Sequence, residues 1–202
     1  MQSLSEIRIA GFGGQGVILA ALVVGKAAAI HQGEYATMTQ NFGPEARGGS
    51  CSAQVILSAE PILYPYVTQP DVLVVMSQEA HTRFIPELKP GGTLIIEQDL
   101  VRLDQVPSGV QIFSVPATRL AEELGRKVVL NIVMVGFFAA VTRLLDPDAL
   151  RQAVTDSVPP ALRKLNLQAF DKGFEYGAAL AVNQPAENGD TESVIATLES
   201  VS

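Results

Sequence analysis

The sequence has few of the side chains that ligate metals or form disulfides, and it carries little basic charge. Its 202 residues include one cysteine, Cys51, and two histidines, His31 and His81. A single thiol rules out an intrachain disulfide, and this set is too small for an iron–sulfur cluster or a zinc site built by the chain alone. The net charge of −7 is opposite in sign to that of nucleic-acid-binding domains. We therefore expect no metal, no cluster and no nucleic acid on this chain.

Long apolar runs are also missing. The most apolar stretch, residues 128–141, is shorter than the roughly 20 residues that a membrane-spanning helix needs, and it contains Asn131. It therefore predicts a buried helix. The first residues lack the basic and apolar segments of a signal peptide, so we expect a cytoplasmic protein without membrane contact. Because only 17% of the residues are charged and 48% are hydrophobic, we also expect apolar surface that contacts other subunits.

Short apolar runs alternate with longer helical patterns along the chain. This alternation predicts an α/β fold, a single Rossmann-like three-layer domain. A hairpin-like insertion at residues 35–57 makes the expected sheet mixed, although mostly parallel. Beyond residue 183 the sequence is polar and rich in helix breakers, so we expect one domain at 1–183 and a flexible tail at 184–202. The expected strands lie at 7–10, 35–39, 51–58, 72–76, 93–97 and 110–115, with a short edge segment at 62–65, and the expected helices at 17–29, 79–84, 117–124, 128–145 and 161–182, with one more helix opening at Asp146.

A glycine-rich turn between the first expected strand and helix is the most informative motif. It has the spacing G-x-G-x-x-G, in which glycine lets the backbone approach a ligand closely. The helix that follows offers unpaired N–H groups and a partial positive charge, which favour a phosphate. The second strand runs into Gln40 and Asn41, and not into the carboxylate that holds the ribose of a dinucleotide. An anion site and a packing turn without a ligand both stay open. The motif residues are Gly11, Gly13, Gly14, Gln15 and Gly16.

A second loop, residues 41–50, holds one arginine among glycines and a proline. Arg47 can bind a phosphate or a carboxylate through two parallel hydrogen bonds. Glu45 is an alternative partner, and this pairing would make the arginine an anchor of its own loop. The residues alone favour neither interpretation.

Four segments of the sequence match the pattern of one known family. They are Gly11-Phe12-Gly13-Gly14-Gln15-Gly16-Val17, Gly43-Pro44-Glu45-Ala46-Arg47-Gly48-Gly49-Ser50, Pro61-Ile62 and Pro70-Asp71-Val72-Leu73. In this order they resemble the gamma subunit of 2-oxoacid:ferredoxin oxidoreductases, and the resemblance is closest to the 2-oxoglutarate enzyme. It covers residues 6–180, and Asn131 in the buried stretch matches a further family pattern.

The resemblance implies a subunit of an enzyme and not a complete enzyme. The family oxidatively decarboxylates a 2-oxoacid, transfers the acyl group to coenzyme A and passes two electrons to ferredoxin, or runs in reverse. In such complexes thiamine diphosphate, Mg²⁺ and [4Fe–4S] clusters belong to the partner alpha and beta subunits, and a ferredoxin-like delta subunit is a further candidate partner.

This chain is then expected to carry no catalytic residue and no cofactor of its own. Its implied role is to help bind coenzyme A at the subunit interface and to close the thiamine site. The expected contact residues are Gly11, Gly13, Gly14, Gln15, Gly16, Glu45, Arg47, Gly48, Gly49, Ser50 and Asn131.

Two other functions stay open, a self-sufficient nucleotide-binding oxidoreductase and a non-catalytic scaffold, and a homodimer is an alternative for the chain expressed alone. We expect Cys51 to be a small buried apolar group. His81 is expected to face solvent, and Glu97, Asp99 and Asp104 to lie in a solvated loop. Two further residues, Tyr64 and Tyr66, predict either a partner-facing surface or loop packing.

Overall fold

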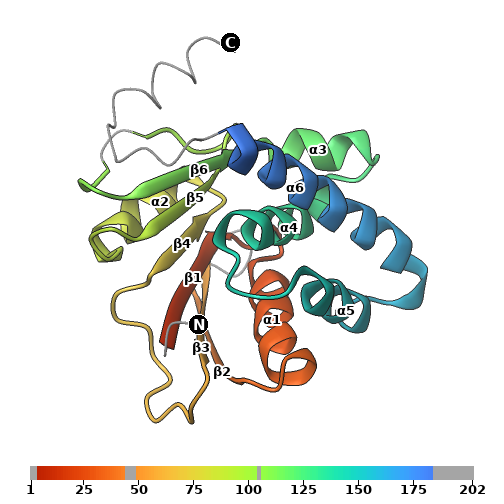
Figure 1. Ribbon diagram of the computed structural model, residues 1–202. Helices are drawn as coiled ribbons and strands as arrows, with labels where there is room; N and C mark the ends of the chain where they lie inside the picture. The colour runs from red at the N-terminus through yellow and green to blue at the C-terminus, as the bar shows by residue number, and fades with distance from the viewer. Residues whose placement is uncertain (1–3, 44–48, 104–105, 184–202) are drawn as a thin grey trace.

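The computed structural model describes residues 4–43, 49–103 and 106–183. A six-stranded sheet in the order β2-β3-β1-β4-β5-β6 forms its middle layer (Figure 1). The strands are β1 (Leu4–Phe12), β2 (Tyr35–Phe42), β3 (Ser50–Ser58), β4 (Val72–Val75), β5 (Thr93–Glu97) and β6 (Gln111–Val115). The α-helices are α1 (Val17–Lys26), α2 (Gln78–Phe84), α3 (Ala117–Glu123), α4 (Leu130–Thr142), α5 (Pro147–Ser157) and α6 (Arg163–Asn183).

The sheet combines a parallel part with an antiparallel hairpin. Strands β1, β4, β5 and β6 pair in parallel, while β3 lies antiparallel to both of its neighbours, β2 and β1. The hairpin of β2 and β3 is inserted between α1 and β4 in the chain, and it adds two strands beside β1. These pairings confirm the predicted α/β domain with a mixed, mostly parallel sheet.

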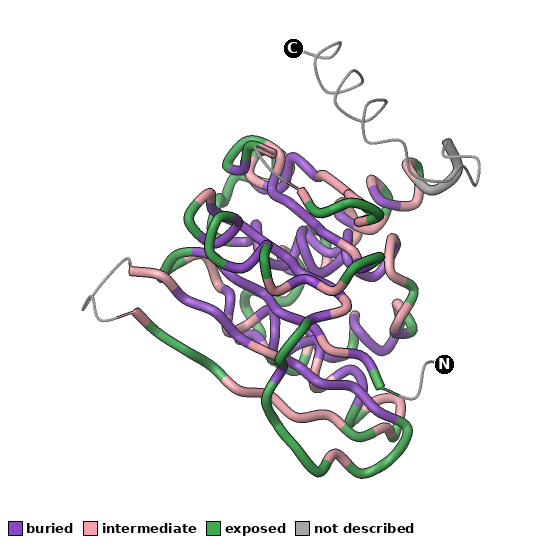
Figure 2. Tube along the Cα trace, turned by 90° about the vertical axis from the view of Figure 1, so that its left-hand side faces the viewer, coloured by how far each residue is buried: buried purple, intermediate pink, exposed green. Residues whose placement is uncertain are grey.

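Alternating side chains of the strands build two cores, one on each face of the sheet. In β4, Val72 and Val74 join the larger core, which contains residues of α1, α3, α4, α5 and α6. Leu73 and Val75 point the other way, into the smaller core under α2. Continuous apolar strands are expected where both faces are covered. Figure 2 shows the same distribution, with buried residues along the central strands and exposed residues in the peripheral loops.

The apolar helix α4 is buried because it crosses α6 at close range. Two glycines permit this approach. A Cβ at Gly136 would overlap the carbonyl of Phe170, and a Cβ at Gly173 would overlap the carbonyl of Val133. The predicted buried helix is therefore confirmed, although it starts later than expected. Residues Lys127–Val129 form a separate 3₁₀ turn.

Several predicted boundaries were wrong. Strand β2 continues through Phe42, because it pairs with β3 up to Cys51, so residues 41 and 42 are not loop. Residues 62–65 form no strand, since Pro61 and Pro65 each lack a backbone donor. Helix α1 passes into a π-helical turn, Ala27–His31, before it ends. The expected tail, 184–202, lies outside the described residues. Within the part of the chain that the structure describes, no helix has both the length and the apolar character needed to cross a membrane.

Candidate functional site

The glycine turn connects the end of β1 to the start of α1. Gly14 and Gly16 have φ values of 97° and 74°, in the left-handed region that other residues adopt at a cost. Gly16 is the residue that precedes α1, so the left-handed conformation directs the chain from the strand into the helix. The predicted order of strand, glycine turn and helix is confirmed.

The side chain of Gln15 closes the turn from inside. Its Oε1 accepts a hydrogen bond from the backbone N–H of Phe12 at 2.6 Å, and its Nε2 donates to the carbonyl of Met76 at 2.7 Å. It therefore ties the end of β1 to the residue that follows β4. A Cβ at Gly11 would overlap Gln15 Oε1, so this glycine makes room for a side chain of the protein itself.

Asn131, at the start of α4, contacts the last glycine of the motif. Its side chain is 2% exposed, and its Nδ2 donates to the carbonyl of Gly16 at 3.2 Å. A Cβ at Gly16 would overlap this amide. Two residues far apart in the sequence, both expected at the site, thus lie in direct contact.

The two glycine-containing segments meet at the edge of the sheet where the parallel strands end, beside the C-terminal end of β1. The N–H of Gly13 donates to the carbonyl of Gly49 at 2.8 Å, and the N–H of Gly43 donates to the carbonyl of Ser50 at 2.7 Å. Ser50 also pairs with Phe12 in the β1–β3 ladder. Gly49 and Ser50 therefore lie beside the glycine turn, and their contact with a ligand stays a prediction. Three other expected site residues, Glu45, Arg47 and Gly48, lie outside the described residues.

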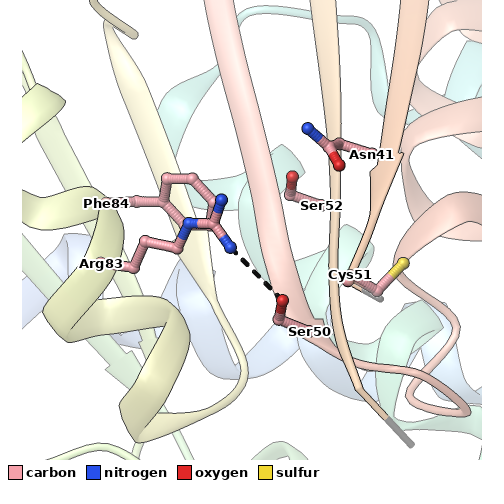
Figure 3. Close-up of a pocket in the computed structure, with 7 residues that line it drawn as sticks. Asn41, Ser50, Cys51, Ser52, Arg83 and Phe84 are labelled. Atoms are coloured by element: carbon pink, nitrogen blue, oxygen red, sulfur yellow. Dashed lines mark hydrogen bonds between the residues drawn. The ribbon is translucent and has the colours of Figure 1, made fainter. Parts of the chain in front are cut away.

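A shallow pocket opens at this edge, on the face of the sheet that α2 covers (Figure 3). The Nη1 of Arg83 donates to Ser50 Oγ at 3.4 Å, across the gap between α2 and β3. In Figure 3 Ser50 turns toward Arg83, whereas the sulfur of Cys51 points away. The described residues that line the pocket are Asn41, Gly43, Ser50, Cys51, Ser52, Arg83 and Phe84. Sequence reasoning did not single out Arg83, and its only signal was a place in the last turn of the helix after β4.

A buried arginine contacts the same aromatic ring as Arg83. Arg8, on β1, is 5% exposed and forms an ion pair with Glu87 at 2.9 Å. Its guanidinium carbon lies 4.6 Å from the centroid of the Phe84 ring, and that of Arg83 lies 5.1 Å from the same centroid. Burial lowers the pKa of Arg8, Glu87 opposes this, and the positive charge of Arg83 lowers it further.

Cys51 is buried in the larger core, as predicted. Burial raises the pKa of its thiol, so the neutral form is favoured. Because a thiol reacts as the thiolate, this residue is not suited to nucleophilic chemistry.

Two expectations about exposed polar residues were wrong. His81 is 2% exposed, because it lies on the face of α2 that packs on the sheet. Glu97 is fully buried, and its carboxylate accepts hydrogen bonds from the N–H groups of Asp99 at 2.8 Å and Thr118 at 2.9 Å. The carboxylate of Glu97 thus satisfies an N–H group of the first turn of α3 that has no partner within the helix, and so stabilises the start of this helix. Asp104 lies outside the described residues.

The aromatic pair Tyr64 and Tyr66 lies far from the glycine turn. Their ring centroids are 5.5 Å apart, both side chains are exposed, and the adjacent Leu63 is 95% exposed. Their loop follows Ser58, which pairs with Leu4 at the opposite end of β1. Contact of this loop with a partner stays a prediction. Among the described residues, no group of three or more His, Cys, Asp or Glu side chains is placed to hold a metal.

Comparisons with known proteins bear on the family and the fold of this chain. The family described as pyruvate ferredoxin/flavodoxin oxidoreductase matches residues 6–176. The 2-oxoglutarate synthase subunit KorC of Methanothermobacter marburgensis is 47% identical over 176 residues, which cover 84% of this chain and 95% of that protein.

Two solved structures share the fold. The gamma subunit of keto/oxoacid ferredoxin oxidoreductase from Geobacter sulfurreducens gives a TM-score of 0.76 at 38% identity, over 87% of this chain and 99% of that chain. The 2-oxoglutarate:ferredoxin oxidoreductase from Magnetococcus marinus, solved with 2-oxoglutarate, coenzyme A and succinyl-CoA bound, gives 0.80 at 25% identity. There the match covers 95% of this chain but 33% of the longer chain.

These matches confirm the resemblance to gamma subunits that the two glycine motifs predicted. The family match spans most of the described chain, and a relative of nearly the same length is 47% identical. The chain therefore belongs to the pyruvate ferredoxin/flavodoxin oxidoreductase family, within which it is similar to the gamma subunits.

Proposed function

We propose that this chain is the gamma subunit of a 2-oxoglutarate:ferredoxin oxidoreductase. The KorC relative supports this assignment by its identity and length, and the Magnetococcus marinus enzyme supports it by fold. The reaction converts 2-oxoglutarate and coenzyme A into succinyl-CoA and CO₂, and two electrons reduce ferredoxin. The alpha and beta subunits, with a ferredoxin-like delta subunit as a further candidate, complete the proposed complex in the cytoplasm.

The proposed role of the chain is to bind coenzyme A at the interface with the thiamine-binding subunits. The observation that carries it is the hydrogen bond from Gly13 to Gly49, because it brings the two glycine segments to one edge of the sheet. Arg47 lies between Gly43 and Gly49 in the sequence. A guanidinium there can pair with a phosphate of coenzyme A.

The cofactors of the reaction are assigned to the partner subunits in this proposal. A single cysteine cannot ligate a [4Fe–4S] cluster. Thiamine diphosphate supplies the carbanion chemistry that releases CO₂ when it is bound there. The residues of this chain orient the thiol substrate and exclude water from the reactive acyl group.

A scaffold function is the second candidate, and one observation favours it. The Cβ positions of Gly11 and Gly16 are occupied by Gln15 and Asn131 of the same chain. Two of the motif glycines are therefore explained by packing alone. On this alternative, replacing Gly13 or Arg47 lowers the yield of assembled complex and leaves the kinetics of each assembled complex unchanged.

The test is Arg47→Ala in the complex co-expressed with its partner subunits. A lost charge-assisted hydrogen bond is worth about 1.5–3 kcal/mol, so we expect the KM for coenzyme A to rise by about 10- to 100-fold. The KM for 2-oxoglutarate and the amount of assembled complex should stay unchanged. Arg163→Ala is the matched control, since Arg163 is exposed on α6 and, among the described residues, donates only to the carbonyl of Thr155.

Two outcomes would contradict the proposal. An unchanged KM for coenzyme A together with reduced assembly supports the scaffold. Submicromolar binding of NADH or FAD by the purified chain, followed by fluorescence, supports a self-sufficient nucleotide-binding oxidoreductase instead.

A further inference from the structure

The pocket beside the 43–50 loop offers neutral hydrogen-bonding groups around one exposed cation. Asn41, Ser50 and Ser52 come from the two strands of the hairpin, and Arg83 comes from α2 (Figure 3). These side chains lie on one face because β2 and β3 pair in register, with Asn41 opposite Ser52. None of the described residues that line the pocket is acidic, although the chain carries a net charge of −7.

The guanidinium of Arg83 is held by neutral contacts. It donates to Ser50 Oγ at 3.4 Å, a long hydrogen bond, and it lies against the Phe84 ring. It forms no ion pair with any carboxylate that the structure describes. A guanidinium has five N–H donors, so most of the donors of Arg83 remain available for a ligand.

A second arginine contacts the same aromatic ring but has its own counter-ion. Arg8 and Arg83 both lie against the ring of Phe84, and the charge of Arg83 acts on Arg8. Glu87 pairs with Arg8 and not with Arg83. The ion pair therefore compensates the buried arginine, while the exposed one stays without a counter-ion among the described residues.

We infer that Arg83 binds a phosphate group of coenzyme A and thereby contributes to the choice of this substrate. The inference rests on the proposed function. The donors of Arg83 and the hydroxyl of Ser50 together form a site for a tetrahedral anion, and Gly43 lines the same pocket. Coenzyme A has two such anionic groups, its diphosphate and its 3′-phosphate.

The experiment measures binding of coenzyme A and of 3′-dephospho-coenzyme A to the assembled complex by calorimetry, together with the KM for each. The variants are Arg83→Gln, which removes the charge, and Arg83→Lys, which keeps the charge but loses the planar fork. Arg163→Gln is the control, because it removes the same charge from an exposed arginine on the opposite face of the sheet.

We expect Arg83→Gln to weaken coenzyme A binding by about 10-fold or more, with a smaller loss for Arg83→Lys and no change for Arg163→Gln. The KM for 2-oxoglutarate should stay constant. If the contact is with the 3′-phosphate, the loss disappears when 3′-dephospho-coenzyme A is used. If the contact is with the diphosphate, the loss is the same for both compounds.

Unchanged coenzyme A affinity in Arg83→Gln would overturn the inference. So would an equal rise in the KM for 2-oxoglutarate, since this would indicate a general disturbance of the complex. The Arg47→Ala variant separates this failure from that of the proposed function. A high KM for coenzyme A in Arg47→Ala with a normal value in Arg83→Gln refutes only the role of Arg83, and normal values in both refute the coenzyme A site altogether.

Discussion

Replacing Gly16 by alanine tests how the glycine turn is built. Gly16 precedes α1 with φ 74° and ψ 23°, and it touches Asn131. Two costs are expected from this single methyl group. The left-handed conformation disfavours any residue with a Cβ, and a Cβ at this position would lie 2.6 Å from Asn131 Cγ, well inside van der Waals contact.

The magnitude follows from these two effects. The left-handed backbone costs alanine about 1–2 kcal/mol. Displacing Asn131 breaks its hydrogen bond to the Gly16 carbonyl at 3.2 Å and leaves buried polar groups without a partner, which costs about 1–3 kcal/mol more. We therefore expect Gly16→Ala to lower the free energy of unfolding by about 2–5 kcal/mol.

The assay is urea unfolding of the purified chain, followed by circular dichroism. With a slope of about 2 kcal/mol per molar urea, the midpoint should fall by roughly 1–2.5 M. Asn131→Ala and the double variant complete a double-mutant cycle. In the Asn131→Ala background the amide overlap is gone, and the remaining Cβ contact of 3.0 Å needs only a small shift. There Gly16→Ala should cost only the backbone strain, about 1–2 kcal/mol.

Additivity would refute this reasoning. If the two single changes sum to the double variant within about 0.5 kcal/mol, the side chain of Asn131 does not explain why position 16 is glycine. A cost below about 1 kcal/mol for Gly16→Ala alone would also contradict the left-handed conformation.

Two more predictions concern the helix crossing and the buried thiol. Gly173→Ala places a Cβ against the carbonyl of Val133 and should destabilise the chain by about 3 kcal/mol in urea unfolding. Gly25→Ala is the control and should not destabilise the chain, because its Cβ would meet Val55 at 3.9 Å, an ordinary contact. Equal losses of stability in the two variants would contradict the close crossing of α4 and α6. Cys51, whose pKa is raised by burial, should react with iodoacetamide at pH 8 far more slowly in the folded chain than in guanidinium chloride. The thiol ionises at a lower pH in the unfolded chain than in the folded chain, so the free energy of unfolding should decline as the pH rises above about 8.5. Cys51→Ala should remove that decline. Equal rates of alkylation in the folded and the unfolded chain would contradict the burial of Cys51.

The glycine turn was predictable because its information is local. An apolar strand, glycines at positions that need special backbone geometry and an apolar helix follow one another directly, so a short window of sequence determines the element order. The same applies to Asp146 and Pro147, which begin α5 as expected: the Asp146 side chain accepts from the N–H of Asp148 at 2.7 Å.

The errors arose where burial depends on distant elements. His81 and Glu97 are polar and lie near turns, so the sequence alone favours exposure. In the folded chain His81 lies on the face of α2 that packs on the sheet, and the carboxylate of Glu97 binds the first turn of α3, about twenty positions along the chain. The C-terminal extension of β2 depends likewise on pairing with β3.

The sequence by itself determined the α/β class, the two glycine motifs and the family resemblance, because these depend on residue type and spacing. Only the tertiary structure showed that Gly13 bonds to Gly49, that Asn131 touches Gly16, and that Arg83 reaches Ser50 from the other layer. These contacts join residues separated by tens of positions, and strand pairing and helix packing bring them together. Their partners therefore cannot be inferred from any short stretch of sequence.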